Sequence, residues 1–203
     1  MNNNPIFSLL GNPNCGKTAV FNLLTGLDQK VSNYPGITVE KKLASIKIDD
    51  NLISFEDYPG AYSSHPQSLD EKIVHDTLFS WMEGSAPKPN GIIYVADSTN
   101  LRRNLYFCTQ LMNLDIPIIL LLNMSDLTDP NTVVDLEKLK KNLNLYDIIP
   151  FSASKKTGLN TLKKTIINLL TDEFQLNHNT LDLSKENSKL LSPIINTLNE
   201  NFS

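Results

Sequence analysis

The feature that most constrains this chain is a glycine-rich motif near its start. Residues 11–18 read G-N-P-N-C-G-K-T, which fits the pattern G-x-x-x-x-G-K-[ST]. The motif follows an apolar run at residues 6–10 and leads into a helical pattern at residues 18–25. In this strand–loop–helix context, backbone N–H groups and the positive end of the helix dipole can wrap a phosphate. The motif therefore predicts a phosphate-binding loop that opens an α/β domain.

Two side chains of this loop have chemical roles in the pattern. Lys17 can reach β- and γ-phosphates, and the Thr18 hydroxyl can ligate Mg²⁺. The other loop positions that we expect to line a nucleotide are Gly11, Asn12, Pro13, Asn14, Cys15, Gly16 and Ala19.

Composition narrows the class of protein. The chain has 203 residues, 40% of them hydrophobic, which suits one α/β domain with a small appendage. Because the net charge is −4, we expect no nucleic-acid partner. Cys15 and Cys108 form no disulfide framework, which favours a reducing compartment. The longest apolar run, residues 116–122, is far below the ~20 residues of a membrane helix, and the first residues lack a signal-peptide pattern.

Strand-like runs alternate with helical patterns along most of the chain. Near-continuous apolar strands indicate a sheet covered by helices on both faces, and a hairpin around residues 49–51 adds one antiparallel strand. We predict a three-layer α/β fold with a six-stranded, mostly parallel sheet. The predicted strands are 6–10, 39–48, 52–56, 91–97, 117–122 and 148–151, and the predicted helices are 18–25, 68–83, 101–114, 134–143 and 159–170.

Two domains are expected. Residues 1–172 would form the nucleotide-binding domain, and a polar, Asn-rich linker would follow. Residues 181–203 resume helical spacing and predict a short C-terminal helical segment, too small to fold alone.

Two motifs after the phosphate loop point to its γ-phosphate. Thr38, in the segment N-Y-P-G-I-T-V-E, lies before a strand, where it could bind Mg²⁺ and sense the γ-phosphate. Asp57 and Gly60 form D-x-x-G at the end of a predicted strand, so the carboxylate could hold the Mg²⁺ shell and the glycine N–H could meet the phosphate. A plain loop threonine and a simple turn are the alternatives, and the order of the motifs favours the functional interpretation.

Two further motifs favour a guanine base. Asn123, Met124 and Asp126 form N-x-x-D after a buried strand. A carboxylate at Asp126 could accept hydrogen bonds from guanine N1–H and N2–H₂, a pair that adenine cannot supply. The alternative is a helix N-cap, which Asn and Asp also favour. After the last strand, backbone N–H groups of Ser152, Ala153 and Ser154 could meet guanine O6.

These signatures, in this order, resemble the Ras-like GTPases of the translation-factor-related branch. The details G-N-P-N-C-G-K-T, N-Y-P-G-I-T-V-E, D-Y-P-G-A-Y-S and N-M-S-D are similar to the cytosolic G domain of FeoB-type bacterial ferrous iron transporters, over roughly residues 4–170. The resemblance implies a Ras-like P-loop GTPase fold and a regulatory module on the cytoplasmic side of the inner membrane. It also implies a membrane permease domain as partner, a homo-oligomer through the full-length protein, and residues 181–203 as a remnant or start of that family's helical domain.

The same resemblance shapes the expected mechanism. Ala61 stands where many relatives of Ras place a water-orienting Gln, so we expect slow hydrolysis with Asn14, Lys17, Thr38 and Gly60 as the catalytic set. Potassium-activated GTPases of this branch imply a K⁺ site made by Asn14 with the carbonyls of Ser32 and Tyr34, where an arginine finger would otherwise act. The alternative for Asn14 is a residue that holds the loop shape. For Arg102 and Arg103, a solvated helix face is favoured over a finger in cis.

Three residues depart from the family pattern. Cys15 replaces a Ser whose backbone does the work, and an exposed redox thiol is the functional alternative. Met124 replaces Lys and implies weaker nucleotide binding with faster exchange, and Tyr58 replaces Leu as a packing variation.

Two other functions share the same loops. One is a soluble GTPase of ribosome or tRNA maturation, which would need a basic RNA-binding appendage that this acidic chain lacks. The other is a nucleotide-dependent binding switch with negligible turnover, which Ala61 keeps open. The three histidines are scattered, and the sequence indicates no iron site; they are His65, His75 and His178.

Overall fold

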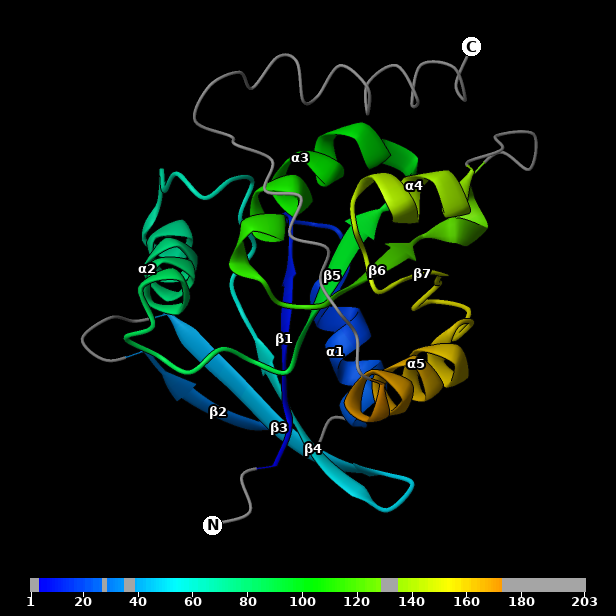
Figure 1. Ribbon diagram of the computed structural model, residues 1–203, viewed down its shortest axis with the longest axis horizontal. Helices are drawn as coiled ribbons and strands as arrows, with labels where there is room; N and C mark the ends of the chain where they lie inside the picture. Colours follow the sequence, from blue (N-terminus) through cyan, green and yellow to red (C-terminus); the bar gives the residue numbers. More distant parts are fainter. Residues whose placement is uncertain (1–3, 27–28, 35–38, 129–134, 173–203) are drawn as a thin grey trace.

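A twisted seven-stranded sheet runs through the centre of the molecule (Figure 1). The computed structural model describes residues 4–26, 29–34, 39–128 and 135–172. The strands lie in the order β2-β3-β4-β1-β5-β6-β7. Only β3 runs against the others, because it pairs antiparallel with both β2 and β4 while the remaining neighbours are parallel. The strands are β1 (Ile6–Gly11), β2 (Lys30–Asn33), β3 (Glu40–Ile48), β4 (Asn51–Asp57), β5 (Gly91–Asp97), β6 (Ile118–Asn123) and β7 (Asp147–Pro150).

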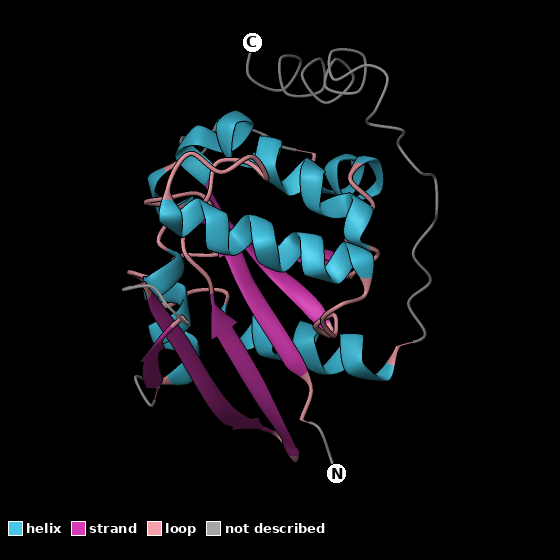
Figure 2. Cartoon of the chain, turned by 90° about the vertical axis from the view of Figure 1, so that its left-hand side faces the viewer, coloured by secondary structure: helices cyan, strands magenta, loops and turns pink. Residues whose placement is uncertain are grey.

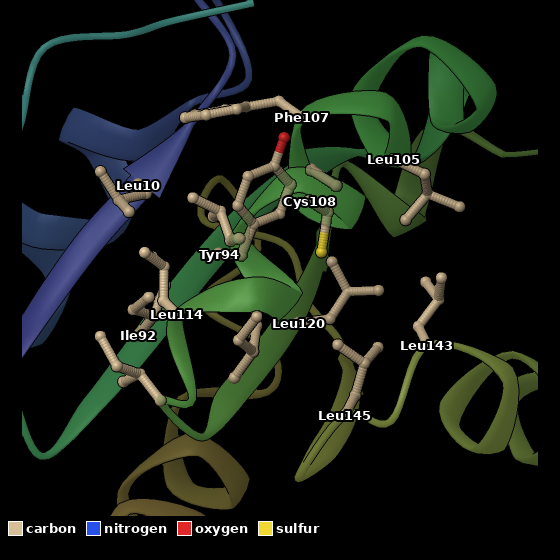
Figure 3. Packing of buried hydrophobic residues seen from close by; sticks show 14 of the residues in the cluster. Leu10, Ile92, Tyr94, Leu105, Phe107, Cys108, Leu114, Leu120, Leu143 and Leu145 are labelled. Carbon is tan, nitrogen blue, oxygen red and sulfur yellow. The ribbon is translucent and has the colours of Figure 1, made fainter. Parts of the chain in front are cut away.

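Helices cover both faces of the sheet and make the predicted three layers (Figure 2). Side chains of α2, α3 and α4 share one apolar cluster with one face of the sheet, and those of α1 and α5 share a second cluster with the other face. Figure 3 shows the first cluster around Tyr94, where Phe107 and Cys108 of α3 pack against β5 and β6. The helices are α1 (Lys17–Thr25), α2 (Leu69–Glu83), α3 (Leu101–Leu111), α4 (Leu136–Asn142) and α5 (Leu159–Thr171).

The predicted strand count of six was too low by one. The missed strand is β2, which pairs with β3 through backbone hydrogen bonds at the sheet edge. All four of its residues are exposed, and Val31 is 52% exposed, so its side chains carry no alternating apolar signal. The prediction of one antiparallel strand is confirmed, since β2 runs in the same direction as β4.

Local capping explains where two helices begin and end. The Ser68 hydroxyl accepts a hydrogen bond from the Glu71 N–H and starts α2, and Gly26 ends α1 in the left-handed conformation. The predicted helix 101–114 is α-helical only to Leu111 and then tightens into a 3₁₀ turn, Met112–Leu114. None of the helices in the described residues is long and apolar enough to cross a membrane.

Candidate functional site

The predicted motifs gather at the carboxyl ends of the parallel strands. The phosphate loop follows β1, Asp57 ends β4, Asn123 ends β6, and Ser152 comes just after β7. This edge is where open α/β sheets bind ligands. The sheet order brings β4, β1 and β5 together, so the two phosphate-directed motifs lie on adjacent strands.

The centre of the site is an ion pair between two predicted ligands. The Lys17 ammonium lies 2.5 Å from Asp57 Oδ1, and the two side chains are only 9% and 5% exposed. Thr18, the first residue after Lys17 in α1, has an exposed side chain. A hydroxyl and a carboxylate are oxygen donors that suit Mg²⁺, which binds through few protein ligands together with phosphates and water. The donor set therefore fits the expected metal.

The D-x-x-G segment packs directly on the phosphate loop. A Cβ placed on Gly60 would lie 2.9 Å from the Pro13 backbone, closer than real Cβ contacts allow. The next residue, Ala61, is fully buried and donates its N–H to the Gly11 carbonyl at 3.1 Å. A side chain at position 60 would collide with the phosphate loop, and the hydrogen bond of Ala61 joins the two segments.

Asn123 joins the phosphate loop to the loop after β7. Its Nδ2 donates to the Cys15 carbonyl at 2.9 Å, and its Oδ1 accepts from the Ala153 N–H at 3.1 Å. Gly16 has a φ of 83°, and a Cβ there would lie 2.3 Å from Asn123 Nδ2 and 3.7 Å from Met124 Cε. Asn123 is only 2% exposed, and its two hydrogen bonds hold its own motif, the phosphate loop and the loop after β7 together.

Asp126 is the exposed acceptor of the predicted base site. Hydrogen bonds from Ser152 and Ser154, together with the nearby Lys155, hold the pKa of its carboxyl below the usual value, with Ser152 the largest cause. The Ser154 hydroxyl lies 3.4 Å from Asp126 Oδ2. A carboxylate that stays ionised at neutral pH can accept two hydrogen bonds, as the base motif requires.

Two residues of the phosphate loop turn their side chains inward. Asn12 is 3% exposed, and its Oδ1 accepts from the Tyr94 hydroxyl at 3.0 Å while its Nδ2 donates to the Arg103 carbonyl at 3.4 Å. Cys15 is 1% exposed, and burial raises the pKa of its thiol to about 11. The alternative of an exposed redox thiol at Cys15 is therefore wrong.

The structure describes the residues proposed for K⁺ but not the residue proposed for γ-phosphate sensing. Asn14 is exposed with a φ of 64°, a left-handed conformation that Asn tolerates better than most residues. Ser32 is exposed in β2 opposite Lys41, and the Tyr34 ring packs 6.4 Å from the Tyr58 ring. Thr38 lies outside the described residues, as does the predicted helical segment 181–203.

Several contacts at this site were not predicted. The Glu71 carboxylate accepts from the N–H groups of Tyr62 and Gln67, and the Arg103 guanidinium lies 4.3 Å from the centre of the Tyr62 ring. The Ser68-x-x-Glu71 capping pattern could have been read from the sequence. The stacking of Arg103 depends on a contact between distant segments, and no local pattern indicates it.

Comparison with known proteins gives a consistent family. The model of the family described as ferrous iron transport protein B matches residues 6–166. The Fe(2+) transporter FeoB of Leptospira biflexa is 38% identical over 156 residues, which are 76% of this chain and 22% of the relative. The chain thus spans about a fifth of the length of that curated relative.

Solved structures agree in fold. The cytosolic domain of the T. maritima FeoB iron transporter in a GDP form has a TM-score of 0.78 and 32% identity, covering 89% of this chain and 68% of that one. The G domain of the same T. maritima protein has a TM-score of 0.72 and 33% identity, covering 83% of this chain and 99% of that one.

Proposed function

The chain belongs to the ferrous iron transport protein B family, and on that premise we propose that it is a GTP-binding and slowly GTP-hydrolysing module of a ferrous iron transporter. It would act on the cytoplasmic side of the bacterial inner membrane, with the membrane permease part of the full-length protein as its partner. The solved relative in a GDP form supports a guanine nucleotide as ligand.

The observation that carries the proposal is the pair Asn123 and Asp126 at the end of β6. Asn123 fixes the phosphate loop against the loop after β7 by two hydrogen bonds, and Asp126 stands beside them as an exposed, ionised acceptor. A nucleotide whose phosphates lie on the loop would extend its base toward this acceptor. Guanine presents two N–H donors there, and adenine does not.

Hydrolysis would depend on position and charge more than on covalent chemistry. Lys17 would neutralise phosphate charge, and the N–H of Gly60 would face the γ-phosphate from the segment that packs on Pro13. Mg²⁺, held by Thr18 and Asp57, would supply charge neutralisation at the β- and γ-phosphates. The ion pair between Lys17 and Asp57 supports these roles, because it places the cationic group and the expected Mg²⁺ ligand side by side.

The rate is expected to be low without a monovalent cation. Ala61 is fully buried, and its methyl group cannot orient a water molecule. We propose that K⁺ binds beside the phosphates through the exposed Asn14 and the carbonyls of Ser32 and Tyr34. The left-handed conformation of Asn14 also supports the simpler role of shaping the loop.

Measured turnover tests the proposal. Release of phosphate from GTP with Mg²⁺ should be faster in KCl than in NaCl, and Asn14→Ala should remove the difference while GDP binding persists. Equal rates of phosphate release in the two salts would contradict the K⁺ role. Tight GDP binding with no turnover in either salt would favour a nucleotide-dependent binding switch, which the buried Ala61 allows.

A further inference from the structure

The segment that follows Gly60 is held from two sides by side chains of the neighbouring helices. From α2, Glu71 accepts the Tyr62 N–H at 3.1 Å and the Gln67 N–H at 2.8 Å. From α3, Gln110 Oε1 accepts the Ser64 N–H at 2.7 Å, and the Arg103 guanidinium lies 4.3 Å from the centre of the Tyr62 ring. Helices α2 and α3 lie over the same face of the sheet (Figure 1).

The two α3 contacts come from one face of that helix. Arg103 and Gln110 are seven residues apart, about two helical turns, so their side chains project in nearly the same direction. The Arg103 carbonyl also accepts a hydrogen bond from Asn12 of the phosphate loop. A single helix therefore touches both the phosphate loop and the segment that carries Gly60.

These contacts matter because Ala61 has no side-chain group that could orient the attacking water molecule. The Ala61 N–H is bound to the Gly11 carbonyl, and Gly60 lies against Pro13, so the placement of residues 60–64 sets the geometry at the γ-phosphate side. The Tyr62 side chain is 39% exposed and would be free to swing away without a partner. The planar guanidinium of Arg103 suits a flat contact with this ring in a way that an ammonium does not.

We propose that Arg103 is a positioning residue for GTP hydrolysis, which acts through the Tyr62 ring to hold residues 60–64 against the phosphate loop. The inference rests on the proposed function. Arg103 is exposed, as expected of a solvated helix face, and the proposal assigns its guanidinium to the ring and not to the phosphates, where an arginine finger would act.

A double-mutant cycle tests the proposal, with kcat and KM for GTP measured in KCl and Mg²⁺. Arg103→Ala should lower kcat by roughly two- to fivefold, the size expected from an exposed cation–π contact, with KM unchanged. Arg103→Lys should restore part of the loss. Arg102→Ala removes the same charge from the same turn and should leave kcat unchanged.

The cycle separates a positioning role from a direct one. If Arg103 acts through Tyr62, the double variant Arg103→Ala with Tyr62→Leu should be no slower than Tyr62→Leu alone. Multiplicative losses would show that Arg103 acts on its own and would overturn the proposal, as would an unchanged kcat in Arg103→Ala.

A second readout does not depend on turnover. Hydrogen exchange at the Tyr62 and Ser64 amides of the nucleotide-free protein should be faster in Arg103→Ala than in wild type, and unchanged in Arg102→Ala. Equal exchange in wild type and Arg103→Ala would refute the positioning contact. Absence of GTP hydrolysis by the wild-type chain would instead refute the proposed function, while the exchange experiment still judges the contact.

Discussion

We expect Asn123 to be the polar side chain of the site whose removal most weakens stability and nucleotide binding. Asn123→Ala removes the hydrogen bonds to the Cys15 carbonyl and the Ala153 N–H from a side chain that is only 2% exposed. At about 1 kcal/mol for each bond, the free energy of unfolding should fall by about 2 kcal/mol. In a protein of this size that corresponds to a drop of about 4–8 °C in Tm. Because the phosphate loop and the loop after β7 would separate, we also expect GDP to bind about tenfold more weakly.

Thermal unfolding of the nucleotide-free protein and a GDP titration would measure the two effects separately. Asn113→Ala, at an exposed asparagine, serves as the matched control and should change neither quantity. An Asn123→Ala protein with the wild-type Tm and the wild-type GDP affinity would refute the role of Asn123 in joining the two loops.

Four further outcomes follow from the geometry. Burial raises the pKa of the Cys15 thiol to about 11 and that of Cys108 to about 12, so thiol reagents at pH 8 should label the folded protein slowly and the unfolded chain quickly; rapid labelling of the folded protein would contradict the buried sites. The pKa of an ordinary thiol is 9.0, so the Cys15 thiol loses its proton at lower pH in the unfolded chain than in the folded protein. The free energy of unfolding should therefore fall as the pH rises from about 9 to 11. Gly60→Ala places a Cβ 2.9 Å from the Pro13 backbone and should lower the hydrolysis rate at least tenfold in a phosphate-release assay, while normal turnover would argue against close packing there. Met124→Lys should slow GDP release in a nucleotide-exchange assay, and faster release would mean that the thioether against Gly16 already covers the nucleotide better than a lysine.

The parts of the fold that could be predicted are those with strong local patterns. Strands β5 and β6 are buried along nearly their whole length, so they are visible as continuous apolar runs between turn residues. Strand β2 could not be predicted in this way, because Lys30–Asn33 is exposed throughout and is a strand only through its backbone pairing with β3.

The same distinction holds at the site. The backbone positions of the phosphate loop, Asp57 and Asp126 follow from motif order, since each motif ends a predicted strand. The inward turn of Asn12 depends on the Tyr94 hydroxyl, 82 residues away, and on the Arg103 carbonyl, 91 residues away. Contacts of this kind are decided by tertiary packing, which a motif does not encode.

The most direct test of a guanine site is a binding titration of wild type and Asp126→Asn with GDP, ADP and xanthosine diphosphate. Two charge-assisted hydrogen bonds at about 1.5–3 kcal/mol each predict that wild type binds GDP at least about 100-fold more tightly than ADP. Asp126→Asn should lose GDP and gain xanthosine diphosphate, because an amide N–H can donate to the carbonyl that xanthine carries in place of the guanine amino group. Equal affinity of the wild type for GDP and ADP, or undiminished GDP binding by Asp126→Asn, would contradict the guanine site.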